Sequence, residues 1–351
     1  MKPLTELTRL GTIRRFRGLA NKALKLYGLG HASLEFLTIA GNVLFRVYSQ
    51  PQETLGRKKG PFEPGQYLLR IHDSREQKTR AIKLEMDWLS AIRKDAGLSV
   101  PEPVRALDGS FVVKVTAPGI PDERVCTLLR WLKGRRITKH VHPHHFLAQG
   151  RTMAQLHNHA EKWRAANDLF KRRFDYDGLF TDDAGAGIPS SAAWKLLPAR
   201  YREAYRMVAH RTKQLMNDWG KNPGVYGLIH GDCGIDANVL FWKGEARIID
   251  FDGSGFGYYL YDVAIALEHC WADPSYTQYL DSFLCGYSEY RYVSDKQLKS
   301  IDLFRAAFYV YMGLWSVAMD HTFPDSPNKI ARHRKWLGYG MEFIESYLKA
   351  H

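Results

Sequence analysis

Asp232, Asn238 and Asp250 are three oxygen-bearing side chains within one stretch, residues 228–267. A hairpin predicted over VLFWKGEARII, with its turn at Lys243-Gly244, would place them on the loops at its two ends. Carboxylate and carboxamide oxygens are ligands that Mg²⁺ accepts together with nucleotide phosphates. Because a further carboxylate can orient a hydroxyl nucleophile, the pattern predicts the chemistry of phosphoryl transfer.

Four short motifs surround these residues in a fixed order. They are His-Gly-Asp at 230–232, Asn-Val-Leu at 238–240, Ile-Ile-Asp-Phe-Asp at 248–252 and Tyr-Asp-Val-Ala at 261–264. Together they resemble the aminoglycoside phosphotransferase-like family, which includes aminoglycoside, choline, homoserine and methylthioribose kinases and stress-response Ser/Thr kinases. The resemblance implies an α+β, two-lobed protein-kinase-like fold, with a small β-rich N-terminal lobe and a larger, mainly helical C-terminal lobe.

The resemblance also implies roles for the residues of this stretch. Asp232 would be the catalytic base or would orient the acceptor hydroxyl, and Asn238 and Asp250 would bind Mg²⁺. Asp262 would support the catalytic loop from the start of the next helix. A purely structural Asp262 stays open, because an aspartate at a helix start is a natural N-cap.

A second set of residues is expected, by the same resemblance, to bind ATP or GTP. Backbone amides near Gly41 would reach the phosphates, a basic side chain paired with a helix carboxylate would position them, and the connector between the lobes would hold the adenine. In chain order the residues are Gly41, Asn42, Arg70, Glu85, Leu129 and Trp131.

The sequence departs from the family pattern at two places. Five residues, rather than the usual four, separate Asp232 from Asn238. We expect either a bulge whose strain Gly234 absorbs or a part for Asp236 in binding the metal. Arg70 stands where the family has a phosphate-binding lysine, and arginine grips phosphate differently from lysine.

Two other clusters favour structural interpretations. The histidines of Lys139-His-Val-His-Pro-His-His145 are irregularly spaced, which predicts a solvated loop rather than a metal site. Cys233 is expected to be a packed thiol. Four scattered cysteines form no disulfide or zinc pattern, which favours a reducing, cytoplasmic setting.

Hydrophobic periodicity indicates the elements that must position these groups. It predicts an amphipathic N-terminal helix with Leu10 and Phe16 on its apolar face. Two strands around Ala40-Gly41-Asn42 and a third over GQYLLRIH should follow, then a helix ending at Gly97. A hairpin over VRALDGSFVVKVTAP, with its turn at Asp108-Gly109, and a strand over RVCTLLR complete this half, and helical patterns dominate from Pro143.

We therefore expect two domains. Residues 1–128 would form the nucleotide-binding lobe, including the basic N-terminal helix, and residues 129–351 the helical lobe with the catalytic loop and the acceptor site. The length, beyond that of a typical single domain, favours such a division.

Composition narrows the class of partner. The 50 Lys and Arg exceed the 37 Asp and Glu, for a net charge of +13, which favours anionic partners such as nucleotide phosphates. No apolar run approaches the length needed to span a bilayer, so no membrane partner is expected. No nucleic-acid motif occurs, and nucleic acid is an unfavoured partner.

The sequence thus predicts a Mg²⁺-dependent kinase that transfers the γ-phosphoryl group of ATP or GTP to a hydroxyl of a small molecule, such as an amino alcohol or an antibiotic. One alternative is a protein Ser/Thr kinase like the stress-response members of the family. The other is a non-catalytic nucleotide-binding pseudokinase or nucleic-acid-binding scaffold.

Overall fold

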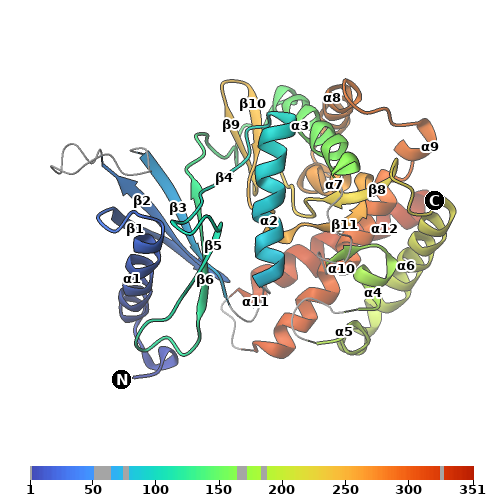
Figure 1. The fold of residues 1–351 in the computed structure, drawn as a ribbon. Helices are drawn as coiled ribbons and strands as arrows, with labels where there is room; N and C mark the ends of the chain where they lie inside the picture. Colours follow the sequence, from blue (N-terminus) through green and yellow to red (C-terminus); the bar gives the residue numbers. More distant parts are fainter. Residues whose placement is uncertain (1, 51–64, 74–78, 164–171, 183–187, 325–327) are drawn as a thin grey trace. The chain divides into compact units, whose positions relative to one another are not determined.

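A computed structural model describes residues 2–50, 65–73, 79–163, 172–182, 188–324 and 328–351 (Figure 1). The chain divides into two compact units, Met1–Lys133 and Gly134–His351. The mixed α+β architecture, with an antiparallel sheet in the first unit and mainly helices in the second, confirms the predicted fold class. The lobe functions that we assigned to 1–128 and 129–351 stay predictions. In the described ranges, no helix combines the length and the apolar character needed to cross a membrane.

An antiparallel sheet forms the centre of the first unit. Its strands run in the order β1-β2-β3-β6-β4, and β5 pairs with β6. The β1–β2 turn lies at Gly41, as predicted, and Gly41 has a positive φ of 67°. The strands are β1 (Ser33–Ala40), β2 (Asn42–Ser49), β3 (Gly65–Ile71), β4 (Glu102–Pro103), β5 (Val112–Val115) and β6 (Arg124–Arg130).

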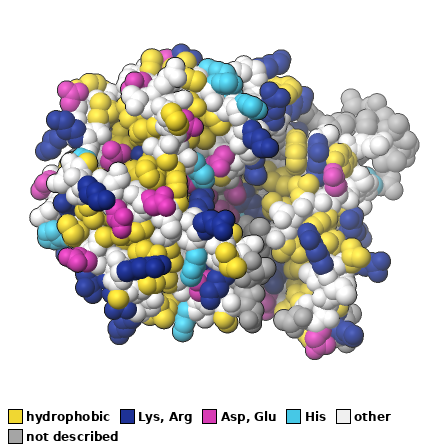
Figure 2. Space-filling view, turned by 180° about the vertical axis from the view of Figure 1, so that it is seen from behind, with side chains coloured by type: hydrophobic (Ala, Val, Ile, Leu, Met, Phe, Trp, Pro, Cys, Tyr) yellow, Lys and Arg dark blue, Asp and Glu magenta, His cyan; other side chains and the backbone are white. Residues whose placement is uncertain are grey.

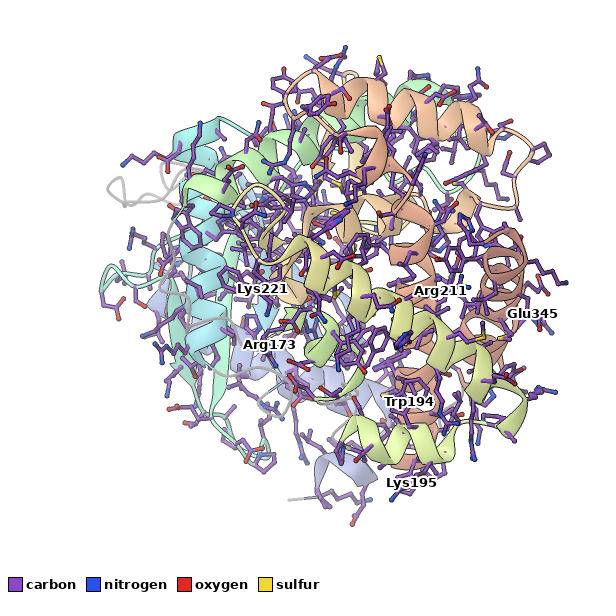
Figure 3. All side chains as sticks on the ribbon, turned by 90° about the vertical axis from the view of Figure 1, so that its right-hand side faces the viewer. Arg173, Trp194, Lys195, Arg211, Lys221 and Glu345 are labelled. Carbon is purple, nitrogen blue, oxygen red and sulfur yellow. The ribbon has the colours of Figure 1, made fainter. Side chains whose placement is uncertain are left out.

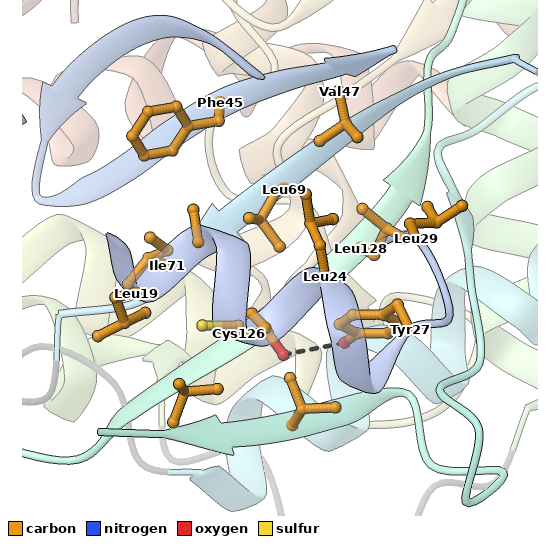
Figure 4. Close-up of a cluster of buried hydrophobic side chains, with 14 of the residues drawn as sticks. Leu19, Leu24, Tyr27, Leu29, Phe45, Val47, Leu69, Ile71, Cys126 and Leu128 are labelled. Carbon is orange, nitrogen blue, oxygen red and sulfur yellow. Dashed lines mark hydrogen bonds between the residues drawn. The ribbon is translucent and has the colours of Figure 1, made fainter. Parts of the chain in front are cut away.

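Helix α1 (Arg9–Leu26) packs its apolar face against this sheet. Phe16, Leu19 and Leu24 are buried together with side chains of the strands. Tyr27, just after the helix, donates a hydrogen bond to the Cys126 carbonyl at 3.1 Å and so ties the helix end to β6 (Figure 4). The N-terminal helix is confirmed, but Leu10 is 68% exposed, so the apolar face begins later than predicted.

In the region after β3, local sequence patterns predict the helix end and a turn correctly but predict the wrong strand pairing. Helix α2 (Thr79–Ala91) continues as a π-helical turn, Ile92–Ala96, and ends at Gly97 as predicted. The predicted turn at Asp108-Gly109 is present, since Ala106 N donates to Ser110 O at 2.7 Å. The predicted hairpin is wrong, however, because β5 after this turn pairs with β6 and not with the segment before it.

The second unit is built from helices and two small sheets. Strands β7 (Arg173–Phe174), β11 (Gly255–Tyr258) and β8 (Tyr226–Ile229) form one sheet, and β9 (Val239–Trp242) and β10 (Glu245–Ile248) form the predicted hairpin with its turn at Lys243-Gly244. The helices are α3 (Pro143–Lys162), α4 (Tyr176–Phe180), α5 (Ser190–Leu196), α6 (Ala199–Trp219), α7 (Tyr259–Ala266), α8 (Tyr276–Ser288), α9 (Asp295–Leu298), α10 (Ile301–Thr322), α11 (Lys329–His333) and α12 (Gly340–Ala350).

Helices α3 and α8 pack unusually closely through two glycines (Figure 1). A Cβ on Gly150 would stand 2.1 Å from the Phe283 carbonyl oxygen, and one on Gly286 would stand 2.1 Å from the Leu147 carbonyl oxygen. Backbone atoms cannot turn aside as a flexible side chain can. The two helices therefore require glycine at both positions.

Gly286→Ala is accordingly expected to lower the free energy of unfolding by roughly 1–3 kcal/mol, because overpacking forces the helices apart. The matched control is Gly18→Ala in α1, where an added Cβ would meet nothing within 4 Å. That change should raise helix stability, by up to about 1 kcal/mol. Urea unfolding of both variants checks this, and an equal effect of the two changes would contradict the close approach.

Charged side chains on the surface are mixed rather than segregated. On the face in Figure 2, the described Lys and Arg side chains alternate with Asp and Glu and form no continuous basic band. On another side of the second unit, Arg173 and Lys221 lie close together, and both pair with Asp175, at 3.8 and 2.6 Å (Figure 3). Asp175 also caps α4 by accepting from Gly178 N.

Candidate active site

The loop between β8 and β9 holds the first two predicted site residues. Asn238, just before β9, donates from its Nδ2 to the Asp232 carbonyl oxygen at 2.9 Å and to Asp232 Oδ2 at 2.8 Å. The Asn238 carboxamide therefore closes the loop and orients the Asp232 carboxylate. The structure brings Asp232 and Asn238 together despite the additional residue between them.

The additional residue is taken up in a single turn. The amides of Ala237 and Asn238 both donate to the Gly234 carbonyl oxygen at 3.1 Å. Gly234 has no positive φ, and a Cβ there would meet nothing nearer than 3.5 Å. The expectation that Gly234 absorbs strain is therefore wrong. Asp236 Oδ2 lies 3.5 Å from Nε2 of His269, which follows α7.

His230 ties this loop to the end of β10. Its Nε2 donates to the Ile249 carbonyl at 3.0 Å, and its Nδ1 accepts from the Asp232 amide at 3.2 Å. These two bonds fix the neutral tautomer with the proton on Nε2. The ring also packs edge-on against Phe251, at 4.8 Å between centroids. His230 thus holds Asp232 next to the segment that carries Asp250.

Asp262, on α7, supports the loop between β8 and β9. It is fully buried, and its two oxygens accept from the amides of His230 and Gly231, both at 2.7 Å. The residue at the N-cap of α7 is Tyr258, so Asp262 does not cap its own helix. Of the two interpretations that the sequence left open, the loop-supporting one is confirmed.

A buried histidine behind Asp262 was missed by the sequence analysis. His157 of α3 lies 3.3 Å from Asp262 Oδ2 through its Nε2 and 2.7 Å from the Tyr287 hydroxyl through its Nδ1. Burial lowers the pKa of His157, and this outweighs the opposite influence of Asp262, so the ring is neutral at pH 7. The only signal was a polar residue on the buried face of a predicted helix.

The carboxylates around Asp232 repel one another. Burial of the group raises the pKa of Asp232 to about 6, the charges of Asp250 and Asp252 add to the rise, and the Asn238 hydrogen bond opposes it. The Asp232 side chain nevertheless opens to solvent, which screens part of this repulsion. Such a group accepts a proton at neutral pH and is accessible to a substrate.

The donor set fits a divalent cation that phosphates also bind. Asp250 has a positive φ of 66°, rare for a residue other than glycine, and its side chain is exposed. Asn238 Oδ1 accepts no hydrogen bond from any residue that the structure describes. Within the same described ranges no group of three His, Cys, Asp or Glu side chains has the arrangement of a metal cage. Two protein oxygens plus phosphates are the ligand set that Mg²⁺ commonly takes.

In the first unit, Arg70 and Glu85 form a buried ion pair. Arg70 Nη1 on β3 lies 2.8 Å from Glu85 Oε1 on α2, and both side chains are less than 5% exposed. The predicted pairing of the two residues is therefore confirmed. Burying a charged pair costs solvation free energy that the pair only partly recovers, so such pairs often mark a binding site.

The other residues expected at the nucleotide occupy the sheet. Asn42 begins β2 and accepts from the Asp73 amide through its Oδ1 at 3.2 Å. Leu129 is buried in β6, whereas Trp131 continues the strand by donating its amide to Gln66 O at 2.9 Å. The guanidinium of Arg46 covers the Trp131 ring at 4.2 Å. Their role at a nucleotide stays a prediction.

The histidines at the start of α3 and Cys233, for which we expected structural roles, make contacts within the fold. His142 and His145 form a capping box at the start of α3, with the His142 amide donating to His145 Nδ1 at 3.0 Å. Burial and the neighbouring His144 and His142 lower the pKa of His145 to about 4. Cys233 is buried, and burial raises the pKa of its thiol. Part of the histidine cluster is thus a helix start rather than the solvated loop that we expected.

Comparison with known proteins finds a matching family and a similar curated protein. Residues 56–295 match the model of a family described as "Phosphotransferase enzyme family". Over 245 residues the chain is 22% identical to the amicoumacin kinase of Bacillus subtilis (strain 168), covering 69% of this chain and 64% of that protein.

Two solved structures have the same fold. The microcompartment-associated aminopropanol kinase is 24% identical, with a TM-score of 0.75 over 95% of this chain and 98% of that chain. An amicoumacin kinase in complex with AMP-PNP, Ca²⁺ and Ami is 19% identical, with a TM-score of 0.71 over 97% of this chain and 96% of that chain.

Proposed function

Because this chain belongs to the phosphotransferase enzyme family, we propose that it is a small-molecule kinase, which transfers the γ-phosphoryl group of ATP or GTP to a hydroxyl of an amino alcohol, an antibiotic or a similar molecule. The observation that carries the proposal is the pairing of a solvent-open carboxylate, Asp232, with the carboxamide of Asn238, which holds it in one orientation. The names of the similar proteins, an aminopropanol kinase and an amicoumacin kinase, favour a small-molecule acceptor over a protein.

In the proposed reaction Asp232 orients the acceptor hydroxyl and takes its proton. The hydroxyl oxygen forms a bond to the γ-phosphorus while the bond from that phosphorus to the β–γ bridging oxygen breaks. The nucleoside diphosphate leaves with the electron pair of the broken bond. Holding the hydroxyl in line for attack is the main contribution that a protein makes to such a transfer.

Asn238 and Asp250 would hold Mg²⁺, with phosphate oxygens completing its ligands. When bound, the ion would supply positive charge that neutralises the phosphates. Two observations support this assignment: Asn238 Oδ1 accepts no hydrogen bond from the described residues, and Asp232, Asp250 and Asp252 repel one another.

On the nucleotide side, Arg70 would contact phosphate oxygens while Glu85 holds its guanidinium in place. We expect the double variant Arg70→Met/Glu85→Leu to keep the stability of the wild type approximately, because both buried charges are removed together. Its affinity for ATP should fall about tenfold, the loss of roughly one charge-assisted contact.

Arg70→Lys keeps the charge and should retain most of the affinity for ATP, whereas Arg105→Met removes an exposed arginine of the same unit and serves as the control. Isothermal titration with a non-hydrolysable nucleotide measures all three. Unchanged affinity in the double variant would contradict the role of Arg70.

The experiment that tests the function is a screen of ATP and GTP consumption with Mg²⁺ against three groups of acceptors. The first contains amino alcohols, aminoglycosides, other antibiotics, nucleosides and sugars, the second contains generic protein substrates, and the third contains no acceptor. We expect turnover that depends on a member of the first group. Phosphate incorporated into protein without any small acceptor would instead favour the protein-kinase alternative.

A further inference from the structure

Arg172 lies beside the catalytic loop and has no role in the mechanism above. It immediately precedes β7, and its carbonyl accepts from the Phe256 amide at 3.1 Å. Its guanidinium donates from Nη1 to the Gly253 carbonyl at 3.2 Å. Both ends of the residue are thus fixed to the segment that follows Asp250.

The same guanidinium lies near the proposed base. The point where a Cβ on Gly253 would stand is 3.4 Å from Arg172 Nη1, 3.7 Å from the His230 carbonyl oxygen and 3.9 Å from Asp232 Cβ. Gly253 therefore leaves a gap that Arg172 and Asp232 border from two sides. A larger residue at that position would stand between them.

Arg172 and Arg173 differ in whether a carboxylate lies beside the guanidinium. Arg173 pairs with Asp182 at 2.6 Å and with Asp175 at 3.8 Å (Figure 3). Arg172 is exposed, and among the residues that the structure describes no carboxylate lies within 4 Å of its guanidinium. Its hydrogen bond to Gly253 uses one of five N–H donors, which leaves the others for a ligand.

The hydroxyl of Tyr261 provides a second, independent observation. It is buried and has no hydrogen-bond partner in the described part of the chain. Burial raises the pKa of this hydroxyl, so it stays protonated and is a donor. The charges of Arg172 and Asp232 both act on it, in opposite directions. Both charges are therefore near enough to the Tyr261 hydroxyl to act on it.

We propose that Arg172 stabilises the negative charge of the transferring phosphoryl group as it passes from the nucleotide to the acceptor. The inference rests on the proposed function and adds a residue to it. In such a transfer the charge spreads over three equatorial oxygens. A guanidinium presents paired donors that match two such oxygens, and it lies beside the residue that orients the attacking hydroxyl.

The first measurement uses the chain of residues 1–351 and needs no identified acceptor. Binding of ADP with Mg²⁺ is measured alone and with aluminium fluoride, which mimics the transferring phosphoryl group. In Arg172→Gln, which keeps a hydrogen-bond donor and loses the charge, we expect the gain in affinity from aluminium fluoride to fall roughly 10- to 100-fold. The affinity for ADP alone should stay within about threefold of the wild type. Arg172→Lys should recover part of the gain.

The matched control is Arg173→Gln, which removes the same charge one residue further along. It should leave the gain from aluminium fluoride unchanged, and melting temperatures of all variants exclude unfolding.

An unchanged gain in Arg172→Gln would overturn the inference. So would a raised acceptor KM at constant kcat, which would assign Arg172 to acceptor binding. If Asp232→Asn abolishes turnover while Arg172→Gln has wild-type kcat, only this inference fails. A wild type without phosphoryl transfer overturns the proposed function and this inference together.

Discussion

Asp232→Asn should lower the rate of phosphoryl transfer by about 10³-fold, because it removes the group that takes the hydroxyl proton. Asn has almost the same shape, so the rest of the site should stay intact. The affinity for nucleotide should therefore change little. The variant is measured by steady-state turnover together with nucleotide titration.

The stability of the same variant provides a second check. Because the folded protein raises the pKa of Asp232, its ionised form is disfavoured at pH 7 relative to the unfolded chain. Asparagine removes this penalty, so the melting temperature should equal or exceed that of the wild type. The matched control is Asp236→Asn on the same loop, whose side chain pairs with His269, and it should retain turnover. Equal losses in both variants would contradict the assignment of the base.

Asp262→Ala should produce the second large effect, a fall in turnover of at least about 100-fold. The change leaves the amides of His230 and Gly231 without their acceptor, at a cost of roughly 1–3 kcal/mol each. Without these bonds the loop no longer holds Asp232 in place. Turnover and urea unfolding are measured side by side.

Two further variants distinguish an effect on the loop that carries Asp232 from a general loss of stability. Asp262→Asn keeps one acceptor oxygen and should lose less turnover than Asp262→Ala. Asp218→Ala removes an exposed aspartate of α6 and should change neither quantity. If Asp262→Ala unfolds more easily but the folded fraction has wild-type kcat, Asp262 serves stability alone and the loop does not depend on it.

Much of this arrangement could be predicted because its signals are local. The β9–β10 hairpin follows from Lys243-Gly244, which take the positive φ angles that a tight turn requires. The order of Asp232, Asn238 and Asp250 around that hairpin places all three on its flanking loops. Gly97 marks the end of its helix for the same kind of reason.

The features that the sequence could not indicate depend on contacts between residues far apart in the chain. The segment before Asp108-Gly109 has a strand-like pattern, but β5 finds a better partner in β6. The turn closed on the Gly234 carbonyl is a backbone arrangement with no side-chain signal. His157, 105 residues before Asp262, and Arg172, 81 before Gly253, acquire their roles only through folding.

The central claim is that Asp232 directs the γ-phosphoryl group to the hydroxyl of a small molecule. The most direct test is mass spectrometry of the reaction products after incubation with ATP whose γ-phosphoryl oxygens carry ¹⁸O, using an acceptor found in the screen. The account predicts that the wild type places the labelled phosphoryl group on the acceptor and that Asp232→Asn leaves the acceptor unmodified. Label found only in inorganic phosphate or on the protein itself, or equal labelling of the acceptor by both proteins, would contradict it.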